Sequence, residues 1–172
     1  DLKPDNLFMI PGENKAGFKL KLIDLDFSIL SDIKAPWHGH EGSGYVGTPG
    51  YRSPEHLRGE VPQEASDIYT CGLILSELIG EGHPLRQEEN IEEATVEGRF
   101  VPVKLQQDIN KVENSELLEN AINSCFNPDP SKRPSARDLL NALQGKEVEI
   151  NDFNPTGSPT REDKDPEVEE PK

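Results

Sequence analysis

The residue types most able to do chemistry stand at the start of the chain, in the stretch DLKPDN. It places an acid, a lysine and an amide within six residues, as Asp1, Lys3 and Asn6. On a short loop these groups suit phosphoryl transfer, in which the acid orients a hydroxyl, the lysine offsets phosphoryl charge and the amide oxygen binds Mg²⁺. Asp24, at the end of the apolar run in KLIDLDFS, can supply a carboxylate to the same ion. Taken singly, each element is weak, because such residues meet by chance in many loops.

Two strands and a long loop must position these residues. Residues 7–10 are apolar, residues 11–17 are rich in turn formers, and residues 18–22 alternate apolar side chains with lysine. We therefore expect a β-hairpin whose second strand has one wet face and delivers Asp24 at its end. Residues 28–55 hold many Gly and Pro residues without periodicity, and a loop of this length is usually functional or mobile.

The first predicted helix follows this loop at residues 67–79. Its apolar stripe continues almost all round, so we expect the helix to be buried, with Asp67 as its N-cap. Residues 82–105 are interpreted as a loop around one short acidic helix.

Two further helices are predicted near the C-terminal end. One starts at Ser115 and stops at Asn127, before a proline. The other starts at Ser135, where Asp138 completes a short capping box, and Gly145 is its expected C-cap. The fold class expected is α+β, mainly α-helical with a small β-hairpin at its N-terminal edge.

Composition excludes several classes of partner. The formal net charge of −15 disfavours nucleic acid and anionic membrane surfaces, which both attract basic proteins. The chain has no apolar run of about 18 residues, so we expect no membrane span and no membrane contact in this segment. Cys71 and Cys125 fall in apolar helical patterns, which fits buried thiols in a reducing compartment. We expect a cytoplasmic protein, whose parent could be tethered to a membrane outside these residues.

The last part of the chain differs from the rest. Residues 146–172 carry nine acids and four bases with little apolar content. Such a segment buries too little surface to offset its ordering entropy. We expect a domain over residues 1–145 and an acidic disordered tail over 146–172.

Five stretches, in order, resemble motifs of eukaryotic-type (Hanks-type) serine/threonine protein kinases. DLKPDN resembles the catalytic loop, entered at the Asp of the His-Arg-Asp motif, and KLIDLDFS resembles the Asp-Phe-Gly segment. GTPGYRSPE (47–55) is similar to the end of the activation segment, and SDIYTCGLILSEL (66–78) to the buried central helix of the large lobe. NPDPSKRPSARDLL (127–140) resembles the arginine turn and final helix. The resemblance covers residues 1–145 and implies a kinase large lobe, the C-terminal lobe, without the N-terminal lobe.

The resemblance also implies roles for the residues that match its motifs. Asp1 would be the catalytic base and Lys3 would contact the γ-phosphate of ATP. Thr48 would bridge Asp1 and Lys3 and help to seat the substrate hydroxyl. Asn6 and Asp24 would bind Mg²⁺. A lysine at position 3 resembles serine/threonine kinases rather than tyrosine kinases.

Other matching residues would have structural or regulatory roles. Glu55 would pair with Arg133, and Asp67 would anchor the catalytic loop through the loop's backbone amides. Ser43 is a plausible activating phosphosite, since a phosphate there could order the loop through a basic residue. Outside the motif order, Glu55 and Arg133 would be interpreted as ordinary surface charges.

The chain departs from the family pattern after Asp24. Leu25 and Asp26 stand where the family has Phe and Gly. Asp26 either adds a carboxylate beside the metal or biases the loop, or it is a tolerated variant that points to solvent, which is the simpler interpretation. In the activation segment His38, His40 and Glu41 could suggest a metal, but one spacer and no fourth ligand make mobile polar residues the better interpretation.

An acidic run also admits two interpretations. It is either a solvated helix face or a feature that favours basic substrates by electrostatic complementarity. The run comprises Glu88, Glu89, Glu92, Glu93 and Glu97.

Together these observations predict a serine/threonine protein kinase that transfers the γ-phosphate of ATP, with Mg²⁺, to Ser or Thr hydroxyls of protein substrates. The chain is expected to be a fragment that needs its own missing N-terminal lobe and is inactive alone. Asp26 and the unseen upstream lysine keep a pseudokinase, acting as a scaffold or binding module, as the alternative. A small-molecule kinase is disfavoured by GTPGYRSPE, which in the family shapes a peptide-binding edge.

Overall fold

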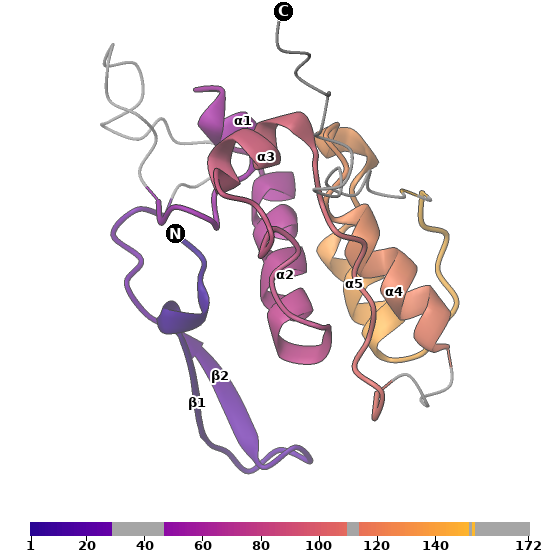
Figure 1. The fold of residues 1–172 in the computed structure, drawn as a ribbon. Coiled ribbons are helices and arrows are strands. Elements are labelled where there is room, and N and C mark those ends of the chain that lie inside the picture. The colour runs from indigo at the N-terminus through magenta and orange to yellow at the C-terminus, as the bar shows by residue number, and fades with distance from the viewer. Residues whose placement is uncertain (29–46, 110–113, 152, 154–172) are drawn as a thin grey trace, which may run out of the picture.

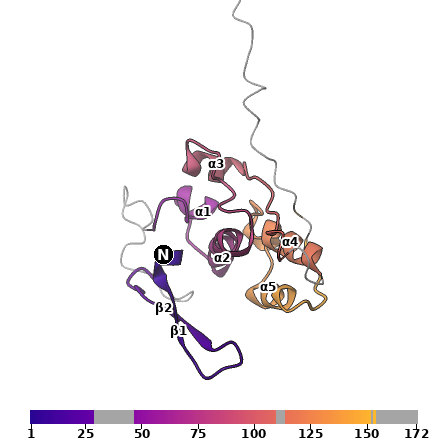
Figure 2. The ribbon, with the colours of Figure 1, turned by 60° about the horizontal axis from the view of Figure 1, so that its bottom comes forward.

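The computed structural model describes residues 1–28, 47–109, 114–151 and 153. Its central element is the helix α2 (Glu64–Ile79). A β-hairpin lies on one side of α2, and the helices α4 (Ser115–Ser124) and α5 (Ala136–Leu143) lie on the other (Figure 1, Figure 2). Among the described residues the fold is therefore mainly helical with one small sheet at its N-terminal edge.

The hairpin forms where the sequence predicts it. Strand β1 (Leu7–Pro11) pairs antiparallel with β2 (Phe18–Leu22), in a register that sets Leu7 opposite Leu22. A short 3-10 helix, η1 (Pro4–Asn6), precedes β1. The hairpin loop closes through a hydrogen bond from the Gly12 N–H to the Gly17 carbonyl, at 2.9 Å.

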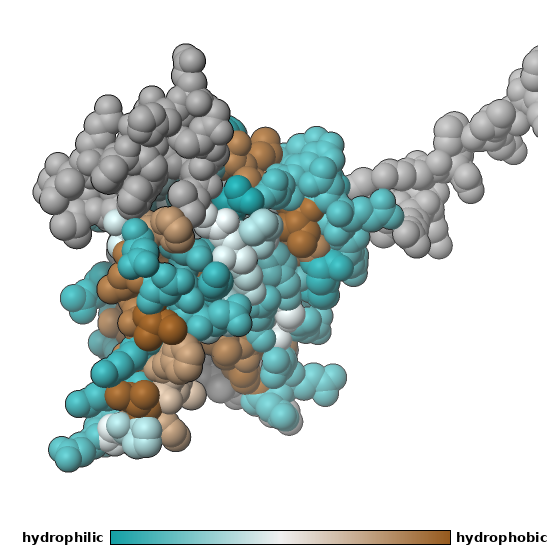
Figure 3. Space-filling view, turned by 90° about the vertical axis from the view of Figure 1, so that its left-hand side faces the viewer, coloured by the Kyte–Doolittle hydropathy of each residue, from teal (hydrophilic) through white to brown (hydrophobic). Residues whose placement is uncertain are grey.

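The expectation of a half-buried second strand is wrong. Every residue of β2 is exposed, because no described element covers its apolar face. Along the hairpin and the segment that follows it, apolar side chains come to the surface in the lower part of Figure 3. The large apolar side chains exposed here are Phe8, Met9, Phe18, Leu20, Leu22, Ile23, Leu25 and Phe27.

Helix α2 begins three residues earlier than its apolar stripe predicts. Its N-cap is Gln63, whose backbone N–H donates to Ser66 Oγ at 3.0 Å. Asp67 therefore lies inside the helix, and its expected role as the N-cap is wrong. The prediction missed this start because glutamine is not among the preferred capping residues and residues 64–66 carry no apolar periodicity.

The core is built around aromatic side chains on α2 and its neighbours. Tyr69 packs edge-on against Phe126, with ring centroids 5.7 Å apart, and Phe126 stacks on Phe100 at 5.1 Å. All three side chains are fully buried, together with Leu73. Their contact joins α2 to the segments on both sides of α4.

A glycine lets α2 approach the end of α4. A Cβ built on Gly72 would lie 2.6 Å from the Cβ of Cys125 and 3.1 Å from Cε1 of Phe126. Real Cβ atoms do not come this close, so the two segments can pack at this distance only because residue 72 has no side chain.

Two short helices pack against each other after the segment 47–53. The helix α1 (Pro54–Leu57), which the sequence did not predict, packs against α3 (Ile91–Glu97), which is the short acidic helix that it did. Asn90 caps α3 by accepting the Glu93 N–H at 3.2 Å.

The last helix has the capping box expected from its sequence. Ser135 Oγ accepts the Asp138 N–H at 3.2 Å, and the Asp138 carboxylate accepts the Ser135 N–H at 3.1 Å. At the other end Gly145 adopts φ 68°, the left-handed conformation that favours glycine. The 3-10 helix η2 (Pro130–Lys132) precedes α5.

Packing continues past residue 145, where the sequence predicts the tail to begin. Val148 and Ile150 pack on the cluster formed by α2, α4 and α5, and Phe153 packs on the aromatic core. Ser124 Oγ donates to the Asn151 carbonyl at 2.7 Å. None of the helices in the described ranges is both long enough and apolar enough to cross a lipid bilayer.

Candidate active site

Asp1, Lys3 and Thr48 lie in direct contact. Lys3 Nζ donates to Asp1 Oδ2 at 3.0 Å and to Thr48 Oγ1 at 2.8 Å. The Thr48 N–H donates to the other Asp1 oxygen, Oδ1, at 2.8 Å. The Asp1 side chain is only 8% exposed and that of Lys3 20%. An acid, an ammonium and a hydroxyl from segments 45 residues apart are thus fixed within one partly buried cluster.

Asn6 is tied to the same loop by both its side chain and its backbone. Its amide Nδ2 donates to the Asp1 carbonyl at 2.9 Å, and its own carbonyl accepts the Ile23 N–H at 3.1 Å. The first bond fixes the amide orientation, and the second joins η1 to the end of β2. Asn6 is 5% exposed, so its remaining amide oxygen has a defined position.

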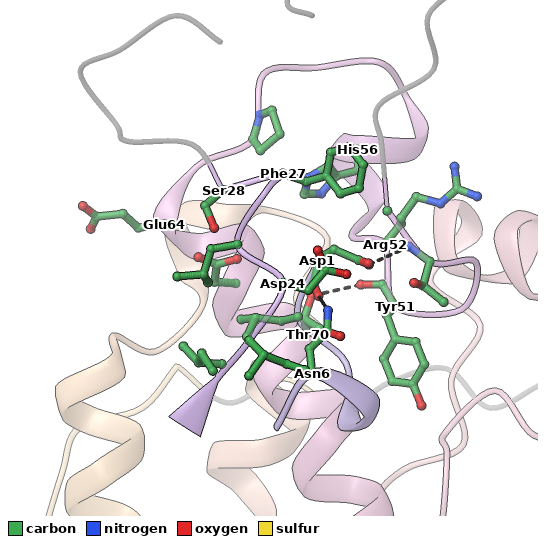
Figure 4. A pocket seen from close by; sticks show the side chains of 18 of the residues that line it. Asp1, Asn6, Asp24, Phe27, Ser28, Tyr51, Arg52, His56, Glu64 and Thr70 are labelled. Atoms are coloured by element: carbon green, nitrogen blue, oxygen red, sulfur yellow. Dashed lines mark hydrogen bonds between the residues drawn. The ribbon is translucent and has the colours of Figure 1, made fainter. Parts of the chain in front are cut away.

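Asp24 follows directly on this joint. Its backbone has φ 56°, a left-handed conformation that Asp tolerates better than most residues. The exposed Asp24 side chain lines the same pocket as Asp1 and Asn6 (Figure 4). Asp26, the replacement for the family glycine, does not have a positive φ, is exposed and is not among the pocket-lining residues. The simpler interpretation of Asp26, a variant that points to solvent, fits this position.

The pocket has a volume of about 270 Å³. Its walls come from the N-terminal loop, the end of β2, the segment 47–56 and the start of α2 (Figure 4). The polar or charged side chains that line it are Asp1, Asn6, Asp24, Ser28, Thr48, Tyr51, Arg52, His56, Gln63, Glu64, Asp67 and Thr70. Leu22, Ile23, Leu25 and Phe27 add an apolar side.

The oxygen donors at this pocket fit a hard cation that takes few ligands from the protein and the others from water and substrate phosphates. Within the described ranges no group of three or more His, Cys, Asp or Glu side chains is placed to hold a metal. The pocket does offer the Asn6 amide oxygen and the Asp24 carboxylate. Mg²⁺ is commonly bound by one or two protein oxygens together with water and substrate phosphates, so these two oxygens fit it.

Glu55 and Arg133, which the resemblance pairs, form a fully buried two-point ion pair. Arg133 Nη1 donates to Glu55 Oε1 at 2.7 Å, and Nη2 donates to Oε2 at 2.8 Å. Ser66 Oγ also donates to Oε1, at 2.7 Å. Burial alone would raise the pKa of Glu55. The hydrogen bonds from Arg133 and Ser66 outweigh this effect, and the pKa is lowered from 4.5 to about 2. Because Arg133 also donates to the Ala65 and Asn127 carbonyls, the pair joins α1, α2 and the turn before α5.

The resemblance also implies roles for Asp67 and Ser43. Asp67 lies at the pocket, in the first turn of α2, and is exposed. Within the described ranges its carboxylate accepts no hydrogen bond from the amides of the N-terminal loop, so the anchoring role implied for it is not formed here. Ser43, the expected phosphosite, lies outside the described residues, as do His38, His40 and Glu41.

Two residues of the site were missed by sequence reasoning. Tyr51 Oη donates to the Glu77 carboxylate at 2.9 and 3.1 Å, and burial together with Glu77 raises the Tyr51 pKa to about 12. Arg52 lines the pocket beside it and pairs with Glu92, whose Oε1 lies 2.6 Å from Nη2. Both residues stand inside GTPGYRSPE, and a basic side chain between pocket residues was the signal that could have identified Arg52.

The acidic run is not a uniformly solvated face. Glu92 is bound by Arg52, and Arg99 binds both Glu97, at 2.6 Å, and Glu88. The Glu88 side chain is only 7% exposed. Three of its five acids therefore already have arginine partners, which reduces the charge available to a basic substrate.

Comparison with known proteins agrees with this geometry. Residues 1–143 match the model of the protein kinase domain. The chain is 34% identical over 161 residues to the G2-specific protein kinase nimA of Emericella nidulans, covering 90% of the chain. It is 31% identical over 142 residues, or 81% of the chain, to the probable serine/threonine-protein kinase nek2 of Dictyostelium discoideum. With the serine/threonine-protein kinase pkn3 of Myxococcus xanthus the identity is 29% over 146 residues, or 83% of the chain.

The matched relatives are much longer than this chain. The alignments cover 20% of nimA, 30% of nek2 and 26% of pkn3. The chain therefore spans less than a third of the length of each of these proteins.

Proposed function

This chain belongs to the protein kinase domain family, and from that premise we propose that it carries the phosphoryl-transfer centre of a serine/threonine protein kinase. The observation that carries the proposal is the contact of Lys3 with Asp1 and Thr48, two residues that line one pocket. A buried structural ion pair would not need a hydroxyl and a pocket beside it. A site that brings a hydroxyl to a phosphoryl group needs all of these features.

Asp1 has the properties of the group that orients the attacking hydroxyl. Its two oxygens are held by Lys3 Nζ and the Thr48 N–H, so the carboxylate has a fixed orientation at the pocket. A serine or threonine hydroxyl that enters the pocket can donate to the remaining lone pairs of this carboxylate. General acid–base groups of this kind contribute about 10²- to 10⁴-fold to a rate.

Lys3 supplies positive charge where the transferred group must pass. The same ammonium that holds Asp1 and Thr48 can offset negative charge on the γ-phosphoryl group of ATP as it moves to the acceptor. Thr48 fixes the position of that ammonium and marks the edge of the pocket at which a peptide would lie. The cluster thus holds acceptor and phosphoryl charge close together, which is the main requirement of this chemistry.

Asn6 and Asp24 would hold Mg²⁺ with the phosphates of ATP. When bound, the ion would neutralise charge on the β- and γ-phosphates. The protein's own contribution is to aim two hard oxygen donors into the pocket, one from a buried amide fixed on the N-terminal loop and one from a carboxylate after β2.

Phosphate transfer from labelled ATP, with Mg²⁺, to a protein rich in serine and threonine tests the proposal. Because the relatives are longer, the assay uses the full-length protein that contains these residues. Asp1→Asn removes the proposed orienting carboxylate. Asp5→Asn is the matched control, since Asp5 is an exposed acid of the same loop that does not line the pocket.

We expect label on serine or threonine with the wild type and with Asp5→Asn, and a loss of at least about a hundredfold with Asp1→Asn. Absence of label in every folded form would contradict the proposal and favour a pseudokinase that acts as a binding module. Equal label in Asp1→Asn and the wild type would contradict the role of Asp1.

A further inference from the structure

Arg52 is a positive side chain among negative ones. Of the described residues that line the pocket it is the one lysine or arginine, whereas Asp1, Asp24, Glu64 and Asp67 are acids. A guanidinium presents several donors in a planar fork that matches a carboxylate. Its position in this wall raises the question of which anion Arg52 binds.

The stem of Arg52 and the Asp1 carboxylate both border Gly47. A Cβ built on Gly47 would lie 3.1 Å from Cγ of Arg52 and 4.0 Å from Oδ1 of Asp1. The bare Gly47 backbone thus borders both the arginine stem and the carboxylate proposed to receive the acceptor hydroxyl. Because Arg52 and Asp1 both line the pocket, the arginine belongs to a wall that a peptide seated at Asp1 would meet.

The head of Arg52 is only partly satisfied. Its Nη2 donates to Glu92 Oε1 at 2.6 Å, and the Glu92 side chain is 46% exposed. Its Nε is buried and has no hydrogen-bond partner among the described residues. An ion pair with so exposed a carboxylate contributes little, and a buried N–H without an acceptor is unfavourable. The head can therefore exchange Glu92 for a better-placed anion at low cost.

We propose that Arg52 is a specificity-determining residue that selects peptide substrates with an acidic side chain next to the acceptor serine or threonine. Consecutive Cα atoms lie about 3.8 Å apart, so the residues flanking the acceptor are those that come nearest to Arg52. A carboxylate there can take two parallel hydrogen bonds from the guanidinium fork. Glu92 then acts as an internal competitor that occupies Arg52 when no substrate is bound.

This inference rests on the proposed function, because it places the peptide at Asp1. Its test is nevertheless a binding measurement that does not need phosphate transfer. Two labelled peptides contain the same acceptor serine, flanked on both sides by glutamate in one and by glutamine in the other. Their affinities for the chain are compared by fluorescence anisotropy in the wild type, Arg52→Gln and Glu92→Gln. Arg58→Gln is the control, since Arg58 is an exposed arginine that does not line the pocket.

The wild type and Arg58→Gln are expected to bind the glutamate peptide about fivefold more tightly than its glutamine twin, as for a partly exposed ion pair. Arg52→Gln abolishes this preference. Glu92→Gln increases it, because the competitor is gone, and added salt reduces it in every form that shows it. The opposite sign for Glu92→Gln separates recognition by Arg52 from a merely structural effect of its loss.

Equal binding of the two peptides by the wild type, or a preference that survives Arg52→Gln, would overturn the inference. The same peptides used as acceptors in the full-length protein report separately on the proposed function. No transfer, together with the expected binding preference, would reject the enzyme while leaving Arg52 as an acidic-peptide site.

Discussion

At the scale of single residues, one buried acid and one strained backbone position stand out. Glu55 is an acid kept ionised in the interior by Arg133 and Ser66. Asp24 accepts an unfavourable backbone conformation at the pocket, at φ 56°. Backbone strain of this kind persists only where the surrounding structure holds it, and the residue before Asp24 is held by the Ile23–Asn6 hydrogen bond.

The Glu55 ion pair predicts a specific loss of stability in acid. The pKa of Glu55 falls from 4.5 to about 2 on folding, so its contribution is complete above pH 4.5 and is lost as the pH falls towards 2. That contribution is of the order of 3 kcal/mol. Glu55→Gln should lower the free energy of unfolding at pH 7 by about 3–5 kcal/mol, since it leaves Arg133 buried without its partner.

Urea unfolding at a series of pH values measures this effect. The deficit of Glu55→Gln should shrink between pH 4.5 and 2, whereas the exposed control Glu60→Gln should follow the wild type throughout. A deficit that stays constant between pH 4.5 and 2 would show that the lost stability does not depend on the charge of the Glu55 carboxylate.

The Asp24 carboxylate predicts a separation of stability from binding. Asp24→Asn keeps a side chain that tolerates left-handed geometry but removes the charge, so the free energy of unfolding should change by less than about 0.5 kcal/mol. Mg²⁺-dependent binding of a fluorescent ATP analogue should weaken about tenfold or more, because a proposed metal ligand is lost. Asp26→Asn, two residues on, should leave both quantities unchanged, and an equal loss there would argue against a specific role for Asp24.

At the scale of elements, the close approach of α2 to the end of α4 depends on one missing side chain. Alanine at position 72 is intrinsically better in a helix than glycine by about 1 kcal/mol. Its Cβ would, however, meet the Cβ of Cys125 at 2.6 Å, which requires the two elements to separate. Overpacking of this kind costs about 1–3 kcal/mol, so packing should outweigh propensity.

Gly72→Ala should therefore lower the free energy of unfolding by up to about 2 kcal/mol, as measured in urea. Asn120→Ala, on the exposed face of α4, has no such contact to lose and should be neutral or stabilising. A Gly72→Ala variant more stable than the wild type would mean that α2 and α4 do not pack at the distance described.

The elements that local sequence could predict are those whose signals lie within a few residues. The Ser135–Asp138 capping box and the β-hairpin belong to this class. The start of α2 does not belong to this class, because it is stabilised by Ser66, which is hydrogen-bonded to Glu55, eleven residues away. The ion pair of Arg52 with Glu92, forty residues later in the chain, could not be predicted from any local pattern.

At the scale of the whole molecule, the hairpin presents apolar surface to solvent. The cross-strand pair Met9 and Leu20 is 71% and 64% exposed. The alternation in residues 18–22 indicated that the apolar side chains share one face of the strand. It could not show whether another element covers that face. Contiguous exposed apolar surface of this kind binds hydrophobic dyes or other protein surfaces.

Double substitution of this pair, Met9→Gln with Leu20→Gln, should reduce the fluorescence of a hydrophobic dye mixed with the chain by about half. The free energy of unfolding should change by less than about 0.5 kcal/mol, because neither side chain is buried. Leu78→Gln is the control, since Leu78 lies on α2 and is 63% exposed. Dye binding unaffected by the double substitution would place the accessible apolar surface elsewhere.

The central claim is that Asp1 acts in the transfer step itself, and a single-turnover measurement tests it most directly. The rate of phosphate transfer from saturating MgATP is compared in the full-length wild type and Asp1→Asn, alongside the affinity of each for ATP. We predict a rate that falls about a hundredfold or more while the affinity for ATP changes by less than about threefold. An unchanged rate, or a rate and an affinity that fall together, would contradict the claim.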